Sequence, residues 1–196
     1  MTTTLIDSPV ANVANIARAL RAAGASLDVT RDPQAIARAS KLVLPGVGSF
    51  AAAMRWLEET RIDAAIREAV ANDAFLLGIC VGHQLLFDVS SEMGTTRGLG
   101  LIRGSVGKFE GALPVPQIGW NRVTARGPLF DGVNEQAFYF VNSYAARNVE
   151  DEIASADYNG SFTAAVQRER VFGVQFHPEK SSSAGLRVLR NFVACN

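Results

Sequence analysis

The feature that most constrains this chain is a cysteine flanked by two glycines, Gly78-Ile79-Cys80-Val81-Gly82, between an apolar run and an apolar pattern of helical spacing. A buried parallel strand that enters a helix through a tight turn has this signature. The two glycines let strand and helix close on each other while the central residue is held pointing outward. At a helix N-terminus, the thiolate of Cys80 would be favoured by unpaired N–H groups and the helix dipole. The alternative is an ordinary buried cysteine, since Cys is among the most buried residue types.

Length and charge limit what can surround this turn. At 196 residues the sequence predicts a single domain, 1–196, with a sizeable core, and 48% of the residues are hydrophobic. The net charge is zero, which gives no electrostatic support to a nucleic-acid or membrane-surface role. No apolar stretch approaches the roughly 20 residues that span a bilayer, and residues 1–7 lack a signal-peptide pattern. Two cysteines far apart, Cys80 and Cys195, do not suggest a disulfide framework, so we expect a cytoplasmic protein.

Strand and helix patterns alternate through the first 80 residues. This alternation predicts an α/β domain with a mostly parallel central sheet, flanked by helices and joined by right-handed crossovers. After about residue 94, frequent Gly and Pro predict antiparallel strands and turns added to the sheet. The expected strands are 3–7, 26–30, 41–44, 74–79, 138–141 and 171–176, and the expected helices lie near 16–23, 33–39, 54–57, 62–70 and 186–193, with a loop at 45–50 and Asp32 as a helix cap.

The second reactive candidate is His177, which follows an apolar strand and precedes Pro178 and Glu179. In extended chain, residues two apart share a face, so His177 and Glu179 can point the same way. A carboxylate beside an imidazole fixes its tautomer and steadies the imidazolium. An isolated His-x-Glu is more often a core histidine beside a surface glutamate, but together with Cys80 it favours a Cys-His-Glu triad. The other histidine, His83, is expected in a packing or surface role.

Attack of a thiolate on an acyl carbon also needs an oxyanion hole. The N–H of Val81, directly after the cysteine, is the natural first donor. The glycine loop Pro45-Gly46-Val47-Gly48 could supply the second donor, or it could be a plain tight turn. As a phosphate loop it is weak, because no Gly-Lys-Ser/Thr completes it.

These motifs together resemble the class I, triad-type glutamine amidotransferases, whose fold is a flavodoxin-like three-layer α/β arrangement. More narrowly, the chain resembles the family of glutaminase subunits of imidazole glycerol phosphate synthase, from histidine biosynthesis. The resemblance covers essentially the whole chain in order, and it rests on the blocks 45–50, 78–84, 98–102, 115–121, 139–144 and 176–181.

The resemblance implies a role for each matching residue. Cys80 would attack the side-chain amide of glutamine, forming a γ-glutamyl thioester and releasing ammonia, with His177 as acid/base and Glu179 as its orienter. The Gly46-Val47-Gly48 loop would complete the oxyanion hole through a peptide rearrangement when the partner is engaged. No cofactor and no metal is implied. The positions expected to hold glutamine are Gly48, Gln84, Ser143 and Tyr144, and those expected to face a partner are Asn12, Trp120 and Lys180.

The resemblance also implies a second polypeptide. Ammonium is not a nucleophile, so ammonia must reach its acceptor by a sheltered route. The implied partner is a (β/α)8-barrel cyclase subunit, which would form a heterodimer with this chain and make imidazole glycerol phosphate and an aminoimidazole carboxamide ribonucleotide. We expect low glutaminase activity alone and strong activation when the partner binds its substrate.

Three departures from the family pattern stand out. The first loop reads Ser8-Pro9-Val10-Ala11-Asn12 where the family usually has Tyr-Gly-x-Gly-Asn, and the loss of both glycines is expected to stiffen that turn. Gln117 and Asn142 stand where His is more frequent, and His83 replaces a usual Met. None of these touches the triad.

Two other classes of function are weighed against this interpretation. The first is another enzyme on the same architecture, such as a cysteine hydrolase, a peptidase or an amidotransferase of a different pathway. The second is a binding or scaffold domain without activity. Gln84, Trp120 and the Ser143-Tyr144 pair disfavour the first class, and the intact triad disfavours the second.

Overall fold

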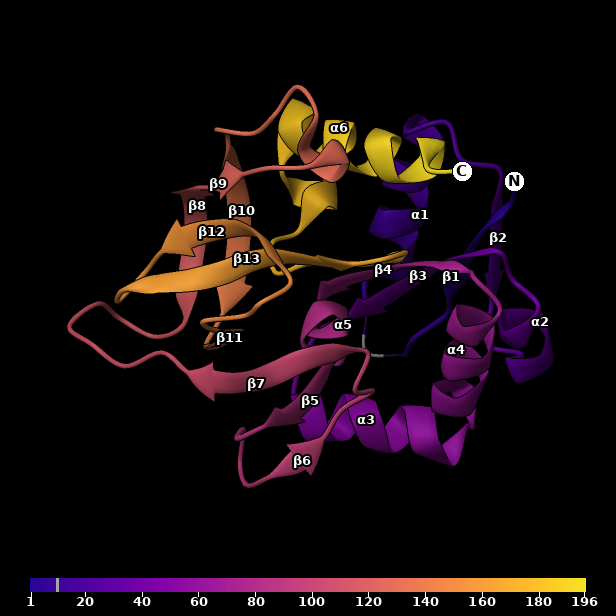
Figure 1. The fold of residues 1–196 in the computed structure, drawn as a ribbon, viewed down its shortest axis with the longest axis horizontal. Coiled ribbons are helices and arrows are strands. Elements are labelled where there is room, and N and C mark those ends of the chain that lie inside the picture. Colours follow the sequence, from indigo (N-terminus) through magenta and orange to yellow (C-terminus); the bar gives the residue numbers. More distant parts are fainter. Residues whose placement is uncertain (10) are drawn as a thin grey trace.

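The computed structural model describes residues 1–9 and 11–196, and an eight-stranded sheet runs through its centre (Figure 1). Five strands are parallel to their neighbours, and three antiparallel strands extend the sheet at one edge. The prediction of a mostly parallel sheet with antiparallel additions is confirmed. The order across the sheet is β2 (Leu27–Thr30), β1 (Thr3–Ile6), β3 (Lys41–Gly46), β4 (Phe75–Cys80), β14 (Val171–Val174), β13 (Ser161–Arg168), β12 (Glu152–Asp157) and β9 (Thr124–Ala125).

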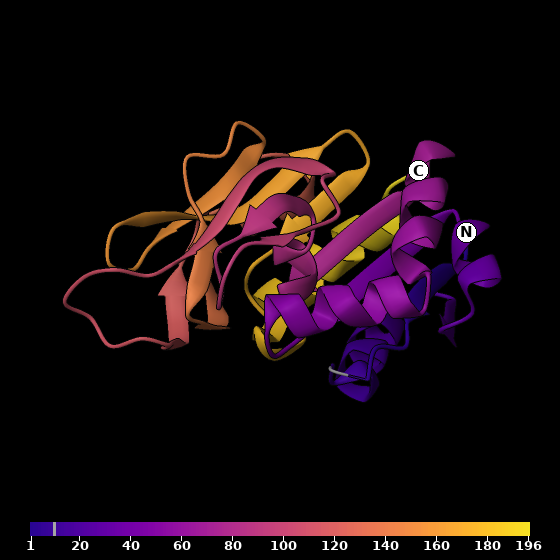
Figure 2. The same ribbon diagram turned by 90° about the horizontal axis from the view of Figure 1, so that it is seen from below.

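Helices cover both faces of the parallel part of the sheet, which gives the expected three layers (Figures 1 and 2). The helix caps follow the sequence, because the side chain of Asp32 accepts a hydrogen bond from the N–H of Gln34 at the start of its helix. Gly24, with a φ of +95°, follows the first helix in the conformation that glycine tolerates best. One face carries α1 (Val13–Ala22) and α6 (Ser182–Ala194), and the other carries α2 (Pro33–Ala37), α3 (Phe50–Glu59), α4 (Ile62–Ala71) and α5 (Val81–Gln84).

The second half of the chain adds two smaller sheets beside the central one (Figure 1). The antiparallel strands expected after residue 94 are present, although β5 and β7 pair in parallel. One small sheet has the order β11 (Tyr144–Ala146), β7 (Ile102–Lys108), β5 (Phe87–Ser90) and β6 (Thr96–Arg97), the other pairs β10 (Ala137–Asn142) with β8 (Gln117–Arg122), and two 3-10 turns are η1 (Pro128–Phe130) and η2 (Pro178–Lys180).

Two local expectations were wrong. Pro45 and Gly46 were expected in a loop, but they continue β3 and pair with Ile79 and Cys80 of β4. The apolar pattern of helical spacing after Cys80, which extends to Phe87 in the sequence, forms a helix of one turn that ends at Gln84, because the backbone from Leu85 onward turns to bond with residues 98–102. A run of buried apolar residues fits a helix or a strand equally well, so periodicity could not separate the two.

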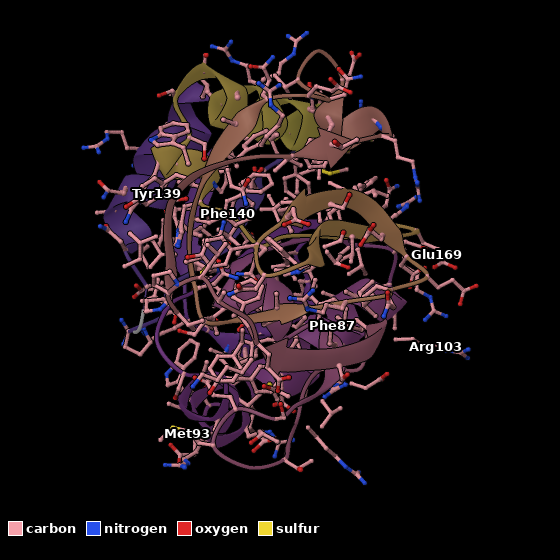
Figure 3. The ribbon with its side chains drawn as sticks, turned by 90° about the vertical axis from the view of Figure 1, so that its left-hand side faces the viewer. Phe87, Met93, Arg103, Tyr139, Phe140 and Glu169 are labelled. Carbon is pink, nitrogen blue, oxygen red and sulfur yellow. The ribbon has the colours of Figure 1, made fainter. Side chains whose placement is uncertain are left out.

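A group of phenylalanines packs between β10, β13 and the end of β14. The rings of Phe138 and Phe176 stack with centroids 4.2 Å apart, and Phe140 meets Phe162 edge to face. Burial of a side chain of this size contributes about 1.5–3 kcal/mol. Figure 3 shows Phe140 in the interior, whereas Arg103, Glu169 and Met93 lie at the periphery. Because Phe176 directly precedes His177, the packing of this cluster fixes the position of the backbone from which the side chain of His177 extends.

A helix needs about 20 predominantly apolar residues to span a bilayer. Across 1–9 and 11–196, no helix is both long and apolar enough to cross a membrane.

Candidate active site

The predicted strand-turn-helix is present, and Cys80 occupies its strained corner. Cys80 ends β4, has φ of 55° and ψ of −112°, and directly precedes α5. A methyl group at Gly78 would lie 2.5 Å from the carbonyl oxygen of Gly82, and one at Gly82 would lie 2.0 Å from that of Leu44. Both contacts are shorter than atoms can approach, so only glycine lets strand and helix pack this closely around Cys80.

Cys80 opens into a cavity of about 360 Å³ that also contains His177. A site of this size suits a small substrate. The cavity therefore brings together the cysteine, the histidine and most of the predicted substrate-binding positions. Those predicted positions are Val47, Gly48, Val81, Gln84, Ser143 and Tyr144. Lys180, which was predicted to face a partner, also lines the cavity, and the lining residues to which the sequence assigned no role are Glu92, Pro116, Val141 and Asn142.

The predicted His-Glu pair forms. Nδ1 of His177 lies 2.8 Å from Oε1 of Glu179, and their side chains are 6% and 2% exposed. The local geometry differs from the extended chain that was expected, because Pro178 begins a 3-10 turn in which the N–H of Lys180 donates to the carbonyl of His177. Proline at the first position of such a turn has its φ already set, so the turn rather than a strand brings the two side chains together.

Hydrogen bonds to β10 hold this turn in place. The N–H of His177 donates to the carbonyl of Tyr139 at 2.9 Å. The hydroxyl of Ser181 donates to the carbonyl of His177 at 2.6 Å and accepts the N–H of Tyr139 at 2.9 Å. Ser181 is fully buried and was not singled out from the sequence, although its place directly after the His-Pro-Glu-Lys run is a signal for such a role.

The electrostatics of the pair favour a protonated histidine. Burial by itself would lower the pKa of His177, but its hydrogen bonds and charge interactions with Cys80 and Glu179 outweigh burial and raise this pKa to about 10. The site therefore places an imidazolium beside the sulfur of Cys80, with Oε1 of Glu179 at Nδ1 of the ring.

A second polar group meets Cys80 from outside the cavity. The side-chain nitrogen of Gln175 lies 3.9 Å from Sγ of Cys80, and its oxygen accepts a hydrogen bond of 2.9 Å from Gln84. Gln84 also donates to the carbonyl of Tyr144 at 2.9 Å, and Asn142 donates to the same carbonyl at 3.0 Å. The sequence analysis did not predict a role for Gln175. It predicted Gln84 as a substrate ligand but not as a hydrogen-bond partner of Gln175.

The residues that depart from the family pattern are buried around this site. Gln117 and Asn142 are direct cross-strand partners on β8 and β10, and the side-chain oxygen of each lacks a hydrogen-bond partner within the described residues. His83 is fully buried, burial lowers its pKa to about 3, and its ring meets Phe87 edge to face at 5.2 Å. Gly173 leaves room for this ring, since a methyl group there would lie 2.4 Å from Nδ1 of His83. Of the two roles expected for His83, the structure shows packing.

Of the other predicted residues, Gly46, Asn12 and Trp120 are not among those that line the cavity, whereas Lys180 is. Gly46 does not line the cavity; a methyl group on it would come within 2.8 Å of the Gly82 nitrogen, so it packs against the turn instead. Asn12 caps α1 and is exposed, whereas Val10 of the same loop lies outside the described residues. Trp120 is 55% exposed and meets Tyr139 edge to face at 6.0 Å. The amine of Lys180 lies 5.9 Å from the centroid of Tyr139 on the same surface.

Residues 4–195 match the family model described as glutamine amidotransferase class-I. This chain belongs to the class-I glutamine amidotransferases. Imidazole glycerol phosphate synthase subunit HisH of Geobacillus thermodenitrificans is 45% identical to it, over 96% of this chain and 93% of that protein. The protein of the same name from Thermococcus kodakarensis is 46% identical, over 96% and 97% of the two chains. The amidotransferase described here is therefore of the HisH kind, an enzyme of histidine biosynthesis that works as the glutaminase subunit of a larger synthase.

Solved structures of low sequence identity share the fold. A crystal structure of a glutamine amidotransferase aligns with a TM-score of 0.78 at 18% identity, covering 97% of this chain and 96% of that one. A glutamine amidotransferase from Thermotoga maritima aligns with a TM-score of 0.64 at 15% identity, over 91% and 76% of the two chains. At this identity the likeness shows the three-layer fold alone.

Proposed function

We propose that Cys80, His177 and Glu179 are the catalytic triad of this amidotransferase and release ammonia from the side chain of glutamine. The observation that carries the proposal is their convergence: a strained cysteine and a buried His-Glu pair meet at one cavity of about 360 Å³. Cys80, activated by a neighbouring base and held at a helix N-terminus, has the surroundings of a nucleophile.

The chemistry follows from the charges at the site. The thiolate of Cys80 attacks the side-chain carbonyl carbon of glutamine, and the imidazolium of His177 gives its proton to the departing nitrogen as the carbon–nitrogen bond breaks. Ammonia leaves, and a γ-glutamyl thioester remains on Cys80. Neutral His177 then takes a proton from water, whose oxygen attacks the thioester. Glutamate departs, and the thiolate and imidazolium are restored.

The oxyanion formed in each step needs donors on one side of Cys80. The N–H of Val81 is the first, because it directly follows the nucleophile and Val81 lines the cavity. Val47 and Gly48 also line the cavity, and Gly48 has a φ of +87° with open space around its α-carbon. That open space supports a rotation of the peptide between Val47 and Gly48 as the source of the second donor.

Glutamine is the substrate that the remaining lining residues suit. Gln84 donates from its side-chain nitrogen to both Gln175 and the Tyr144 carbonyl, so its oxygen remains to accept a hydrogen bond from a substrate N–H group. Ser143 and Tyr144 border the same space and supply further polar groups for the amino-acid end of glutamine.

The partner, in this proposal, is a (β/α)8-barrel cyclase subunit that receives the ammonia. Exposed apolar side chains support a docking surface, since Trp120 is 55% exposed, Ile118 on the same strand is 64% exposed, and Val47, which lines the cavity, is 39% exposed. Lys180 and Asn12 add polar groups to it. Because Val47 and Lys180 of this docking surface also line the cavity, a docked partner would touch the site directly. We propose that glutamine turnover rises when the partner binds its own substrate. Equal turnover with and without the substrate-bound partner would contradict this.

We further propose that residues 1–196 act as one domain in the cytoplasm. The uninterrupted family match over 4–195 supports one functional unit. Both cysteines are free thiols, which suits a reducing compartment.

The decisive experiment replaces Cys80 with Ala and assays the complex with the cyclase partner, using glutamine or ammonium salt as the nitrogen source. We expect the glutamine-dependent product to disappear and the ammonium-dependent product to remain, because only the glutaminase half-reaction needs the thiol. Undiminished product from glutamine would remove Cys80 from the mechanism.

A further inference from the structure

The glutamine behind the nucleophile has a position that packing alone does not explain. Gln175 directly follows β14, and its side chain is fully buried. Its side-chain nitrogen lies 3.9 Å from Sγ of Cys80, yet Gln175 is not among the residues that line the cavity. It therefore touches the reacting sulfur without touching the space where glutamine binds. A polar side chain buried this deeply is retained only where it has partners.

Hydrogen bonds fix which end of this amide faces the sulfur. The carbonyl of Tyr144 can only accept, so the end of Gln84 that lies 2.9 Å from it must be the NH2 group. The same nitrogen of Gln84 lies 2.9 Å from the side chain of Gln175, which must offer its oxygen there. The NH2 group of Gln175 is thereby turned toward Sγ of Cys80. The carbonyl of Tyr144 thus determines the orientation of the Gln84 amide, and the Gln84 amide determines that of the Gln175 amide, so neither orientation is an arbitrary assignment.

We propose that Gln175 is a fourth catalytic residue, whose N–H donates to Sγ of Cys80, favours the thiolate and aims the sulfur at the substrate. This rests on the proposed role of Cys80 as nucleophile. A hydrogen bond donated to an ionised sulfur stabilises the charged form over the neutral thiol. The carbonyl of Val141, also 3.9 Å from Sγ, acts in the opposite sense, because it can accept the thiol proton and offers nothing to a thiolate.

The charged groups around the sulfur lie on the cavity side. His177 contacts Cys80 there, with Glu179 behind the imidazole, and Glu92 and Lys180 also line the cavity. Gln175 is the donor among the described residues that approaches from outside the cavity, so its N–H remains in place when substrate displaces solvent. Its removal should therefore change the ionisation of Cys80. Gln84 would lose its bond to Gln175 but would keep the bond to the carbonyl of Tyr144 that holds it at the cavity.

The test follows the rate at which iodoacetamide alkylates Cys80 as a function of pH, in the wild-type chain and in Gln175→Met and Gln175→Glu. Mass spectrometry of the peptide that contains Cys80 keeps Cys195 out of the measurement. Methionine retains the shape without the donor. We expect the midpoint of alkylation to rise by about one pH unit, so that alkylation below the wild-type midpoint slows about tenfold, as for one lost hydrogen bond to a charged group. Glutamate adds a negative charge and should shift the midpoint further. With the cyclase partner present, kcat for glutamine should fall while KM changes little, since Gln175 does not line the cavity.

The matched control is Gln117→Met, because Gln117 is also a buried glutamine and no hydrogen bond joins it to Cys80 in the part of the chain that the structure describes. We expect it to leave the alkylation midpoint unchanged. Circular dichroism and retained ammonium-dependent synthesis by the complex show that each variant is folded and docked. If Gln175→Met fails this check, Gln84→Met takes its place in the alkylation assay, because it removes the bond that orients Gln175 and should raise the midpoint in the same direction.

Two results would overturn the inference, and they differ from failure of the proposed function. A folded Gln175→Met chain with the wild-type alkylation midpoint means that the amide does not stabilise the thiolate. A changed KM with an unchanged kcat means that Gln175 acts on substrate binding instead. If alkylation of Cys80 left glutamine turnover intact, the nucleophile itself would be wrong, and the proposed function would fail with it.

Discussion

Replacing Glu179 with Gln removes the charge that faces His177 and keeps the shape of the side chain. Burial lowers the pKa of His177, but Cys80 and Glu179 together raise it from 6.5 to about 10. At about 1.4 kcal/mol per pKa unit, this difference amounts to about 5 kcal/mol in favour of the imidazolium. One hydrogen bond to a charged group contributes about 1.5–3 kcal/mol, so Glu179→Gln should lower the pKa of His177 by about 1–2 units.

NMR titration can follow this directly, because the chain has only two histidines. The ring of His83, with a pKa lowered to about 3 by burial, stays neutral above about pH 5, so a ring that loses its proton at alkaline pH is His177. A raised pKa means that His177 keeps its proton as the pH rises toward 10, and the variant should lose it at lower pH. Glutamine turnover by the variant complex should then fall earlier on the alkaline side.

The control for this variant is Glu169→Gln, which removes an exposed carboxylate at the periphery (Figure 3). We expect it to leave both the titration and the turnover unchanged. The reasoning would be refuted if the His177 ring titrated at the same pH in Glu179→Gln as in the wild-type chain.

Three further substitutions test the glycine turn around Cys80, the hydrogen bonds of Ser181 that hold the His177 segment, and the docking surface. Gly82→Ala places a methyl group 2.0 Å from the carbonyl oxygen of Leu44 and should lower the free energy of unfolding in urea by about 3 kcal/mol; unchanged stability would show that the turn has room. Ser181→Ala leaves the buried N–H of Tyr139 without its acceptor, so we expect a loss of about 1–3 kcal/mol and a lower kcat at similar KM, and a wild-type kcat would deny it a positioning role. Trp120→Ala should weaken partner binding, measured by calorimetry, about 30-fold with stability unchanged, as for an aromatic anchor in an interface, and full affinity would place the interface elsewhere.

The parallel half of the fold could be predicted because its signals are local. Asp32 before Pro33 and Gly24 after an apolar stripe mark helix ends through their own hydrogen bonds and dihedral angles, and the structure places both as expected. The secondary structure directly after residue 84 could not be predicted in the same way. Leu85 to Phe87 are all buried, so nothing in the spacing of apolar residues shows that the backbone leaves the helix to bond with residues 98–102.

Only part of the cavity lining could be predicted, because local sequence patterns do not show which distant segments meet. Residues adjacent to a motif, such as Val81 beside Cys80, could be assigned from sequence. Glu92, Pro116 and Val141 line the same cavity, but they come from separate segments of the antiparallel half. Their convergence depends on how the small sheets lie against the central one, and no short-range pattern records it.

Gln175 is different, because the sequence held enough information to find it. It interrupts the apolar run 171–176, and a buried amide in such a strand must be hydrogen-bonded. It also stands two positions before His177, and residues two apart in an extended segment face the same way. If His177 faces Cys80, Gln175 should face it too, which is what the 3.9 Å approach to Sγ shows. The rule that residues two apart share a face, which was used to pair His177 with Glu179, therefore holds for Gln175 and His177, which precede the turn at Pro178. The extended segment after β14 brings Gln175 and His177 to the sulfur, and the 3-10 turn brings the carboxylate of Glu179 to the imidazole.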